Sequence, residues 1–166
     1  MLAEKFWPGP LTMVLPLKEG AAITGAVTAG LPTIALRCPA HPVMQALLRE
    51  SGLFLAAPSA NRSGAISPTR AAHVARSLGD AVPLIIDGGP SQAGLESTIV
   101  ALRPAGWQIL RHGPIAETDI ADLLGTSPLP VTQQSIEAPG QLANHYSPTK
   151  PLRLNAENAA DDEWLI

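Results

Sequence analysis

Residues 57–69 read Ala-Pro-Ser-Ala-Asn-Arg-Ser-Gly-Ala-Ile-Ser-Pro-Thr and join a predicted strand to a predicted helix. The apolar run at 53–56 favours the strand, while Ser67 followed by Pro68 is typical of a capped helix start. The loop between them holds hydroxyls, an amide and an arginine, and Gly64 lets a ligand approach the backbone. The N–H groups at a helix start attract anions. The stretch therefore predicts an α/β fold with a phosphate-binding loop, although an ordinary strand-loop-helix connection has the same composition.

Short apolar or β-rich runs bounded by glycine and proline predict the other strands. The predicted strands cover residues 11–15, 33–36, 53–56, 83–87, 97–102 and 107–110. Helical spacing of apolar residues predicts three helices. They cover residues 42–51, a stretch that buries Ala71, Val74, Ala75 and Leu78 before Gly79, and residues 118–124 before Gly125. The last two strands flank a four-residue turn and predict a hairpin. The expected fold class is α/β, a twisted mixed sheet with flanking helices.

Composition bounds the size of the fold and the class of partner. With 166 residues, 46% hydrophobic and 15% charged, the chain can bury one core but not two full domains. A formal net charge of −3 gives no general attraction to nucleic acid or an anionic membrane. The single cysteine, Cys38, fits small core filler in a cytoplasmic protein and excludes a disulfide framework. No apolar stretch suits a signal peptide or membrane span, so we expect a cytoplasmic protein with no membrane contact.

Residues 126–150 lose this periodicity and contain four prolines. Such a composition predicts a linker or strap. Residues 152–154 are apolar enough to begin another strand, so the sequence predicts the start of a second domain that does not continue.

Several polar motifs favour structural roles. Asp87-Gly-Gly89 is typical of a tight turn after a buried strand, because a lone carboxylate holds a hard cation poorly. His41 fits a loop-ordering role, and His73 should lie on the solvated face of its helix. The spacing of the histidines fits no metal site, so no metal ligand is predicted. Without a Gly-x-x-x-x-Gly-Lys-Ser/Thr motif, any ATP site would differ from a P-loop.

Six short blocks follow one another in a specific order. They are Lys5-Phe-Trp-Pro-Gly-Pro-Leu-Thr12, Arg37-Cys-Pro-Ala-His-Pro42, Ala57-Pro-Ser-Ala-Asn61, Ser67-Pro-Thr69, Asp87-Gly-Gly89 and Glu96-Ser-Thr-Ile99. This ordered set, across residues 4–125, resembles the YrdC-like threonylcarbamoyl-AMP synthases and is far more specific than any one block. Ala138-Pro-Gly140 and His145-Tyr-Ser-Pro148 resemble the linker of the long, two-domain form.

The resemblance implies both a reaction and its binding residues. The reaction joins L-threonine, bicarbonate and ATP, which is accompanied by Mg²⁺, into L-threonylcarbamoyladenylate and pyrophosphate, on the way to threonylcarbamoyladenosine in tRNA. The implied ATP contacts are Thr33, Ser59, Ser67, Arg111 and Tyr146, and the implied L-threonine contacts are Arg37, Ala57 and Ser97. Their chemistry agrees in kind, because a guanidinium forks onto a carboxylate and hydroxyls donate to phosphate oxygens. No side chain looks like a nucleophile, so catalytic residues stay unassigned.

Structural roles remain open for the same residues. Arg37 could be an exposed or structurally paired arginine, Ser67 a helix N-cap and Ser97 a hydroxyl at a strand start. Tyr146 could stack on a nucleotide or pack on the domain.

We expect the chain to be a truncated member of this family. The resemblance implies that a Pro-Thr-Glu-Thr-like strand and a Lys-x-Arg segment, which contact threonine and triphosphate, precede the present first residue. The expected division is a partial catalytic domain at 1–125, a proline-rich linker at 126–150 and the start of a truncated second domain at 151–166. Without the cationic segment the site would be half present and its activity impaired.

Three classes of function remain open. The first and preferred one is the synthase, a nucleotidyltransferase that supplies the downstream machinery for threonylcarbamoyl transfer to tRNA. The second is a double-stranded RNA or tRNA-binding module without catalysis, which the net charge of −3 and the single tyrosine disfavour. The third is a serine hydrolase, which no Gly-x-Ser-x-Gly motif supports.

Overall fold

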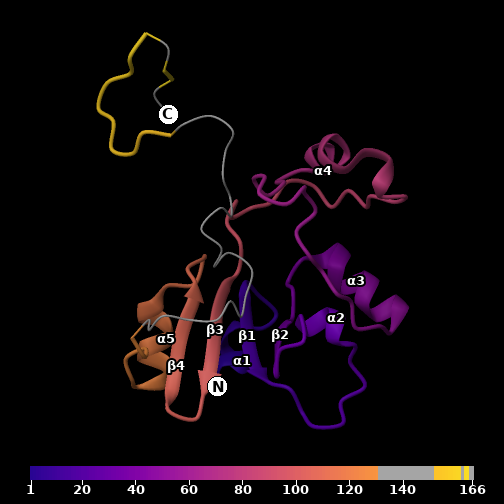
Figure 1. Cartoon of the computed structure of the whole chain (residues 1–166), viewed down its shortest axis with the longest axis vertical. Helices are drawn as coiled ribbons and strands as arrows, with labels where there is room; N and C mark the ends of the chain where they lie inside the picture. Colours follow the sequence, from indigo (N-terminus) through magenta and orange to yellow (C-terminus); the bar gives the residue numbers. More distant parts are fainter. Residues whose placement is uncertain (131–151, 162, 165–166) are drawn as a thin grey trace.

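The computed structural model describes residues 1–130, 152–161, 163 and 164. Its centre is a four-stranded sheet in the order β2-β1-β3-β4 (Figure 1). The strands are β1 (Leu11–Pro16), β2 (Thr33–Arg37), β3 (Thr98–Arg103) and β4 (Gly106–Arg111). β1 is antiparallel to β2 and parallel to β3, and β3 is antiparallel to β4. The predicted mixed sheet is therefore confirmed.

The β3-β4 hairpin forms where the sequence predicts it. Leu102 pairs with Trp107 and Arg103 with Gly106, so the turn closes as a hairpin. The register shifts between Ile99 and Val100, near the beginning of β3. Such irregularities bend a strand and re-aim the side chains beside them. The segment just before β3 is where the candidate site begins.

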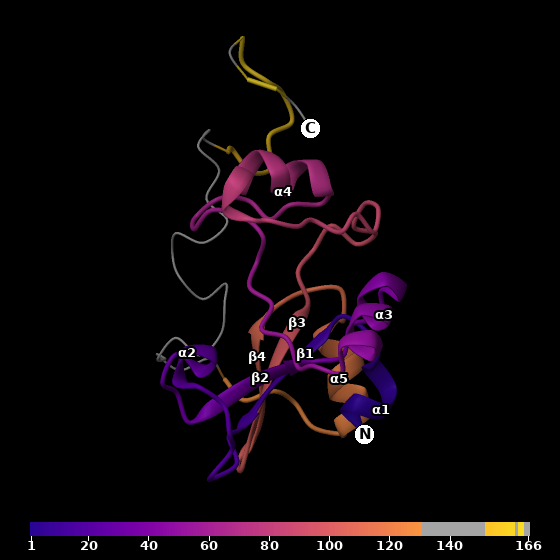
Figure 2. The same ribbon diagram turned by 90° about the vertical axis from the view of Figure 1, so that its right-hand side faces the viewer.

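Helices α1 (Leu2–Phe6) and α5 (Glu117–Leu124) cover one face of the sheet (Figure 2). They close the larger apolar core, whose buried members are Leu2, Leu11, Met13, Val100, Trp107, Ile109, Ile115 and Ile120. A smaller cluster of Val14, Ile99 and Ala101 lies on the other face. The prediction of α5 is confirmed, whereas α1 is too short for a helical period to show in the sequence.

Glycines end two predicted helices as expected. α3 (Pro42–Ser51) ends at Gly52 and α5 ends at Gly125, with φ of 64° and 67°. These angles lie in the left-handed region, which glycine adopts without strain. Cys38, expected in the core, is instead half-buried in front of α3, where the Gln45 amide donates to its sulfur at 3.7 Å.

Helix α4 (Ala71–Leu78) confirms the second predicted helix but corrects its start and its burial. Its N-cap residue is Arg70, without a side-chain cap, so the expected N-cap role of Ser67 is wrong. None of its residues is fully buried, and Ala75 is exposed. Figure 1 shows the reason, because α4 lies away from the sheet and its core. Two further short elements, α2 (Gly25–Thr28) and the 3-10 turn η1 (Gly79–Ala81), have no counterpart in the prediction.

Two predicted strands are wrong. Residues 53–56 and 83–87 are irregular, and neither pairs with a strand in the described part of the chain. Phe54 is fully exposed, and Leu84 exposes 72% of its surface. An apolar run becomes a strand only where a neighbouring strand supplies backbone hydrogen bonds.

The residues that follow α5 lie along β4. The amide of Leu129 donates to Trp107 O at 2.7 Å, and the Trp107 indole donates to Thr126 O and Oγ1, both at 3.1 Å. Residues 126–130 therefore start the predicted linker in a fixed position, while residues 131–150 lie outside the described residues. The expected strand at 152–154 is absent, and Arg153 instead pairs with Glu163. No described helix is long and apolar enough to cross a membrane.

Candidate anion-binding site

One end of the sheet brings together residues from all four strands. β1 and β3 begin there, at Leu11 and Thr98, while β2 and β4 end there, at Arg37 and Arg111. A pocket of about 530 Å³ opens at this end. Its lining includes Pro10, Arg37, Ser67, Glu96, Ser97 and Arg111. The pocket therefore joins the strand ends to the segments that lead to and from α4.

Arg111 is held rigidly at the end of β4. Its Nε donates to Ser97 O and its Nη2 to Ser97 Oγ, both at 3.0 Å. The Ser97 hydroxyl is buried and also lies 2.8 Å from Thr12 Oγ1. These contacts tie β4 to the beginning of β1 and β3, so the guanidinium has one well-defined position in the pocket wall.

Arg37 reaches the same pocket from the end of β2. Its Nε donates to Gly9 O at 3.2 Å, which orients the guanidinium. Although the side chain as a whole is exposed, partial burial of the guanidinium lowers its pKa; Glu96 raises the pKa and Arg111 lowers it further. Arginine keeps its charge in proteins, so Arg37 stays cationic. Besides burial, its pKa shift reflects the nearby charges of Glu96 and Arg111.

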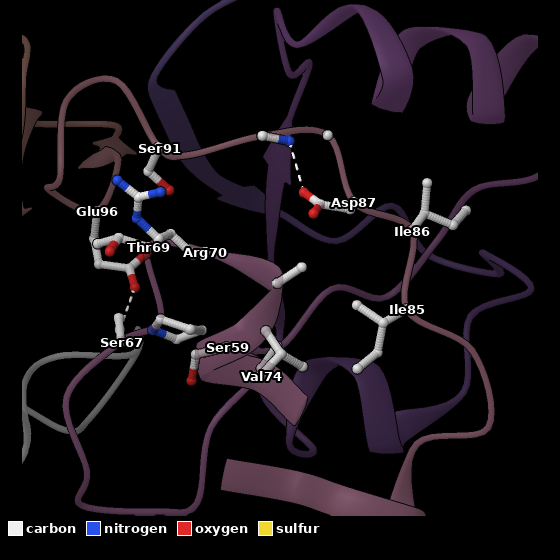
Figure 3. Close-up of a pocket in the computed structure, with 15 residues that line it drawn as sticks. Ser59, Ser67, Thr69, Arg70, Val74, Ile85, Ile86, Asp87, Ser91 and Glu96 are labelled. Carbon is white, nitrogen blue, oxygen red and sulfur yellow. Dashed lines mark hydrogen bonds between the residues drawn. The ribbon is translucent and has the colours of Figure 1, made fainter. Parts of the chain in front are cut away.

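Glu96 supplies that carboxylate. The Ser67 hydroxyl donates to Glu96 Oε1 at 2.6 Å, a contact drawn in Figure 3, and Arg111 Nη2 lies 3.9 Å from Glu96 Oε2. Glu96 therefore links the loop of residues 57–69 to β4, and this contact explains why Ser67 does not cap α4. Sequence reasoning placed Glu96 in a motif but gave it no role. The available signal was an acidic residue two positions before β3, in a chain whose other strands β2 and β4 end in arginine.

The loop of residues 57–69 is braced by its own side chains. Asn61 Nδ2 donates to Arg62 O and Ala65 O, both at 3.0 Å. Its Oδ1 is buried and finds no hydrogen-bond partner in the described structure. The amide of Thr69 donates to His73 Nδ1 at 3.3 Å, so His73 is half-buried and bonded, not solvated as predicted. The Thr69 N–H, which lies just before the helix start where the sequence predicted free donors for an anion, is therefore already bonded to His73.

A second hollow of about 320 Å³ adjoins the pocket and shares Ser67 and Glu96 with it. Its lining includes Ser59 and the apolar Val74, Ile85 and Ile86, which Figure 3 labels. Asp87 accepts a hydrogen bond from the Gly89 amide at 2.8 Å, but residues 87–89 form no regular turn and no strand precedes them. The His41 ring lies against Gly88, where an added Cβ would come within 2.7 Å of its Cε1.

The structure brings together only some of the predicted substrate contacts. Arg37, Ser67, Ser97 and Arg111 line the larger pocket, and Ser59 lines the adjoining hollow. Thr33 pairs with Pro16 at the opposite end of β2, and the exposed Ala57 lines neither hollow. Tyr146 lies outside the described residues. Within the described ranges, no group of three or more His, Cys, Asp or Glu residues is placed to hold a metal.

The fold is α/β, and its larger pocket carries two guanidinium groups, those of Arg37 and Arg111, beside the Glu96 carboxylate. Residues 1–113 match the Sua5/YciO/YrdC family model, described as telomere recombination. This match covers more than half of the chain, which therefore belongs to the Sua5/YciO/YrdC family.

Two relatives and one solved structure illustrate the membership. The chain is 44% identical to the threonylcarbamoyl-AMP synthase of Bacillus subtilis (strain 168), over 92% of this chain and 45% of that protein. It is 41% identical to the threonylcarbamoyl-AMP synthase of Pyrococcus abyssi (strain GE5 / Orsay), over 90% of this chain and 45% of that protein. The crystal structure of P. abyssi Sua5 complexed with L-threonine matches with a TM-score of 0.82 and 40% identity, over 89% of this chain and 44% of that chain. The expected fold is thus confirmed, and the chain spans less than half the length of these relatives.

Proposed function

We propose that this chain contributes part of an L-threonylcarbamoyladenylate synthase site, which uses L-threonine, bicarbonate and ATP. Relatives at 41–44% identity are named threonylcarbamoyl-AMP synthases, and a structural neighbour was solved with L-threonine. The observation that carries the proposal is the convergence of Arg37, Ser97 and Arg111 on one pocket from separate strands.

Arg37 and Ser97 are the proposed threonine contacts. Because Arg37 Nε is committed to Gly9 O, the guanidinium is oriented, and its two terminal nitrogens suit the two oxygens of a carboxylate. Ser97 is 4% exposed and fixed by Thr12 and Arg111, so it offers a hydroxyl of defined position. Ala57 remains a proposed backbone contact.

Arg111, Ser67 and Ser59 are the proposed ATP contacts, together with Thr33 and Tyr146. A carbamate oxygen of carboxylated threonine would attack the α-phosphorus, and pyrophosphate would leave with the bonding electron pair. Such a step needs positioning and cations more than a protein nucleophile. Mg²⁺ would enter with the nucleotide, since it is commonly held by one or two carboxylates plus phosphate oxygens.

The division of the chain is proposed in the same way. Residues 1–125 would form the catalytic part, 126–150 the linker and 151–166 the start of another domain. The contacts of Thr126 and Leu129 with Trp107 hold the first residues of the proposed linker against β4. Limited proteolysis would test it, with cuts expected after residue 130 and none between 98 and 125.

The function is tested by substrate binding and by pyrophosphate release. Calorimetric titration of the full chain with L-threonine and with ATP and Mg²⁺ is expected to show binding of both. Arg37→Lys keeps the charge but removes the fork, so threonine affinity should fall about tenfold. Arg49→Lys, on the exposed side of α3, is the matched control and should leave it unchanged.

A parallel assay follows pyrophosphate release that depends on both threonine and bicarbonate. Detectable release supports the synthase. A chain that binds neither threonine nor ATP, yet binds double-stranded RNA, would contradict the proposal and favour the RNA-binding alternative.

A further inference from the structure

Glu96 occupies a place in the pocket that suits an anion from outside. One of its carboxylate oxygens accepts a hydrogen bond from Ser67 Oγ at 2.6 Å, and the other faces Arg111 Nη2 at 3.9 Å. A phosphate oxygen needs the same surroundings, namely a hydroxyl donor and a guanidinium. The side chain of Glu96 is 33% exposed, so it can turn towards solvent without unpacking the core.

The charges around the pocket support this description. Arg37 and Arg111 are the guanidinium groups among its described lining residues, and Glu96 is the carboxylate. Arg37 and Arg111 repel each other, while Glu96 attracts both. In a partly dehydrated pocket, such charges interact more strongly than in water. A carboxylate of the protein therefore neutralises part of the positive charge that a ligand would use.

We propose that Glu96 is a built-in occupant of the anion site, and that a phosphate group must displace it from Ser67 and Arg111 to bind. This inference deepens the proposed function, on which it rests for the identity of the phosphate as part of ATP. Displacement makes Glu96 a specificity-determining residue. A ligand that contacts Ser67 and Arg111 with phosphate can replace the lost bonds, whereas a ligand without an anionic group cannot.

The displacement has a measurable cost in affinity. When a protein exists in a competent form for only a fraction of the time, the apparent dissociation constant rises by the inverse of that fraction. A carboxylate that fills the position about 90% of the time would weaken phosphate binding about tenfold. Removing its charge should therefore tighten phosphate binding, and the position of the Glu96 carboxylate in the bound state separates displacement from the simple loss of a repelling charge.

The test is calorimetric titration of the full chain with sodium pyrophosphate, without Mg²⁺, in the wild type and in Glu96→Gln. Glutamine keeps the shape and can still accept from Ser67, but it loses the attraction to Arg111. We expect pyrophosphate to bind Glu96→Gln about fivefold to tenfold more tightly. Glu19→Gln is the matched control, because the exposed Glu19 follows the far end of β1, away from the pocket. The pyrophosphate affinity of this variant should equal that of the wild type.

A second measurement uses the wild type alone. The side-chain carboxyl ¹³C resonance of Glu96 should move on pyrophosphate binding to the position of exposed glutamates. A resonance that stays in place would overturn the proposal even if Glu96→Gln fails to fold.

Other outcomes also decide the question. Equal or weaker pyrophosphate binding by Glu96→Gln overturns the proposal, as does the absence of binding by both proteins. If Glu96→Gln binds pyrophosphate more weakly than the wild type only when Mg²⁺ is added, Glu96 is a metal ligand, and the displacement proposal is overturned in that case too. Because none of these titrations requires threonine, bicarbonate or turnover, a chain without synthase activity can still confirm displacement, and the two failures remain distinguishable.

Discussion

Replacing Thr98 by valine should destabilise the fold through one buried side chain. Thr98 is completely buried at the beginning of β3, and its Oγ1 donates to Ile115 O at 2.9 Å. The same Oγ1 accepts from the Ile115 amide at 3.0 Å. One hydroxyl therefore satisfies both backbone groups of a residue that is itself 8% exposed.

The expected cost follows from these two bonds. Valine has nearly the volume of threonine, so Thr98→Val leaves no cavity and removes only the hydroxyl. Each buried backbone group left without a partner costs about 1–3 kcal/mol, so the loss of both bonds should lower the free energy of unfolding by about 2–6 kcal/mol. The segment before Ile115 contains His112 and Pro114, which line the larger pocket. Ligand binding should therefore weaken together with stability.

Equilibrium unfolding in urea, followed by tryptophan fluorescence, measures this cost. With an m-value of about 2 kcal/mol/M, the midpoint should fall by about 1–3 M. Thr33→Val, on the half-buried Thr33 of β2, is the control and should change the free energy by less than about 0.5 kcal/mol. A loss below about 0.5 kcal/mol in Thr98→Val itself would refute the reasoning, because the hydroxyl would then not be the partner of Ile115.

Two further changes test the surroundings of the same hairpin. Gly113→Ala should destabilise the protein by more than about 2 kcal/mol in thermal unfolding, because its Cβ would lie 2.4 Å from both Glu96 O and Thr98 N. Gly25→Ala is the control and should be nearly neutral, because a Cβ there meets no atom within 4 Å. Equal losses of stability in the two variants would contradict the steric argument. Trp107→Phe should lower the free energy of unfolding by about 1–3 kcal/mol, because the hydrogen bonds from the indole to Thr126 disappear. The same change should speed hydrogen exchange of the Leu129 amide, which is bonded to Trp107 O. An unchanged exchange rate would show that the indole bonds do not hold this segment.

The elements predicted correctly are those whose signals are local. The hairpin of β3 and β4 follows from two apolar runs around a short turn, and α3 ends where Gly52 supplies a left-handed residue. The two failed strands, at 53–56 and 83–87, show the limit of such signals. Their apolar composition is real, but a strand also needs a partner, and partners are set by the rest of the fold.

The candidate site was predictable in its residues but not in its contacts. Sequence reasoning selected Arg37, Ser97 and Arg111, which meet in one pocket because four strand ends converge. It gave Ser67 an implied ATP contact and left a helix N-cap open as the alternative. The cap is wrong, because α4 begins only at Ala71 and the Ser67 hydroxyl donates to Glu96, 29 positions away in the sequence. Tertiary contacts of this kind override local capping preferences and leave no trace in the neighbouring residues.

The parallel pairing of β1 with β3 has a consequence for how the chain is made. Leu11 pairs with Thr98, 87 positions later, so the central contact of the sheet closes a very long loop. At a synthesis rate of about 5–20 residues per second, the ribosome needs about 4–17 s to deliver β3 after β1. During that time β1 can pair with β2 but has no neighbour on its other side. Until β3 arrives, that edge of β1 presents unpaired backbone N–H and C=O groups, so the long-range pairing should slow folding and expose the nascent chain to wrong strand pairing.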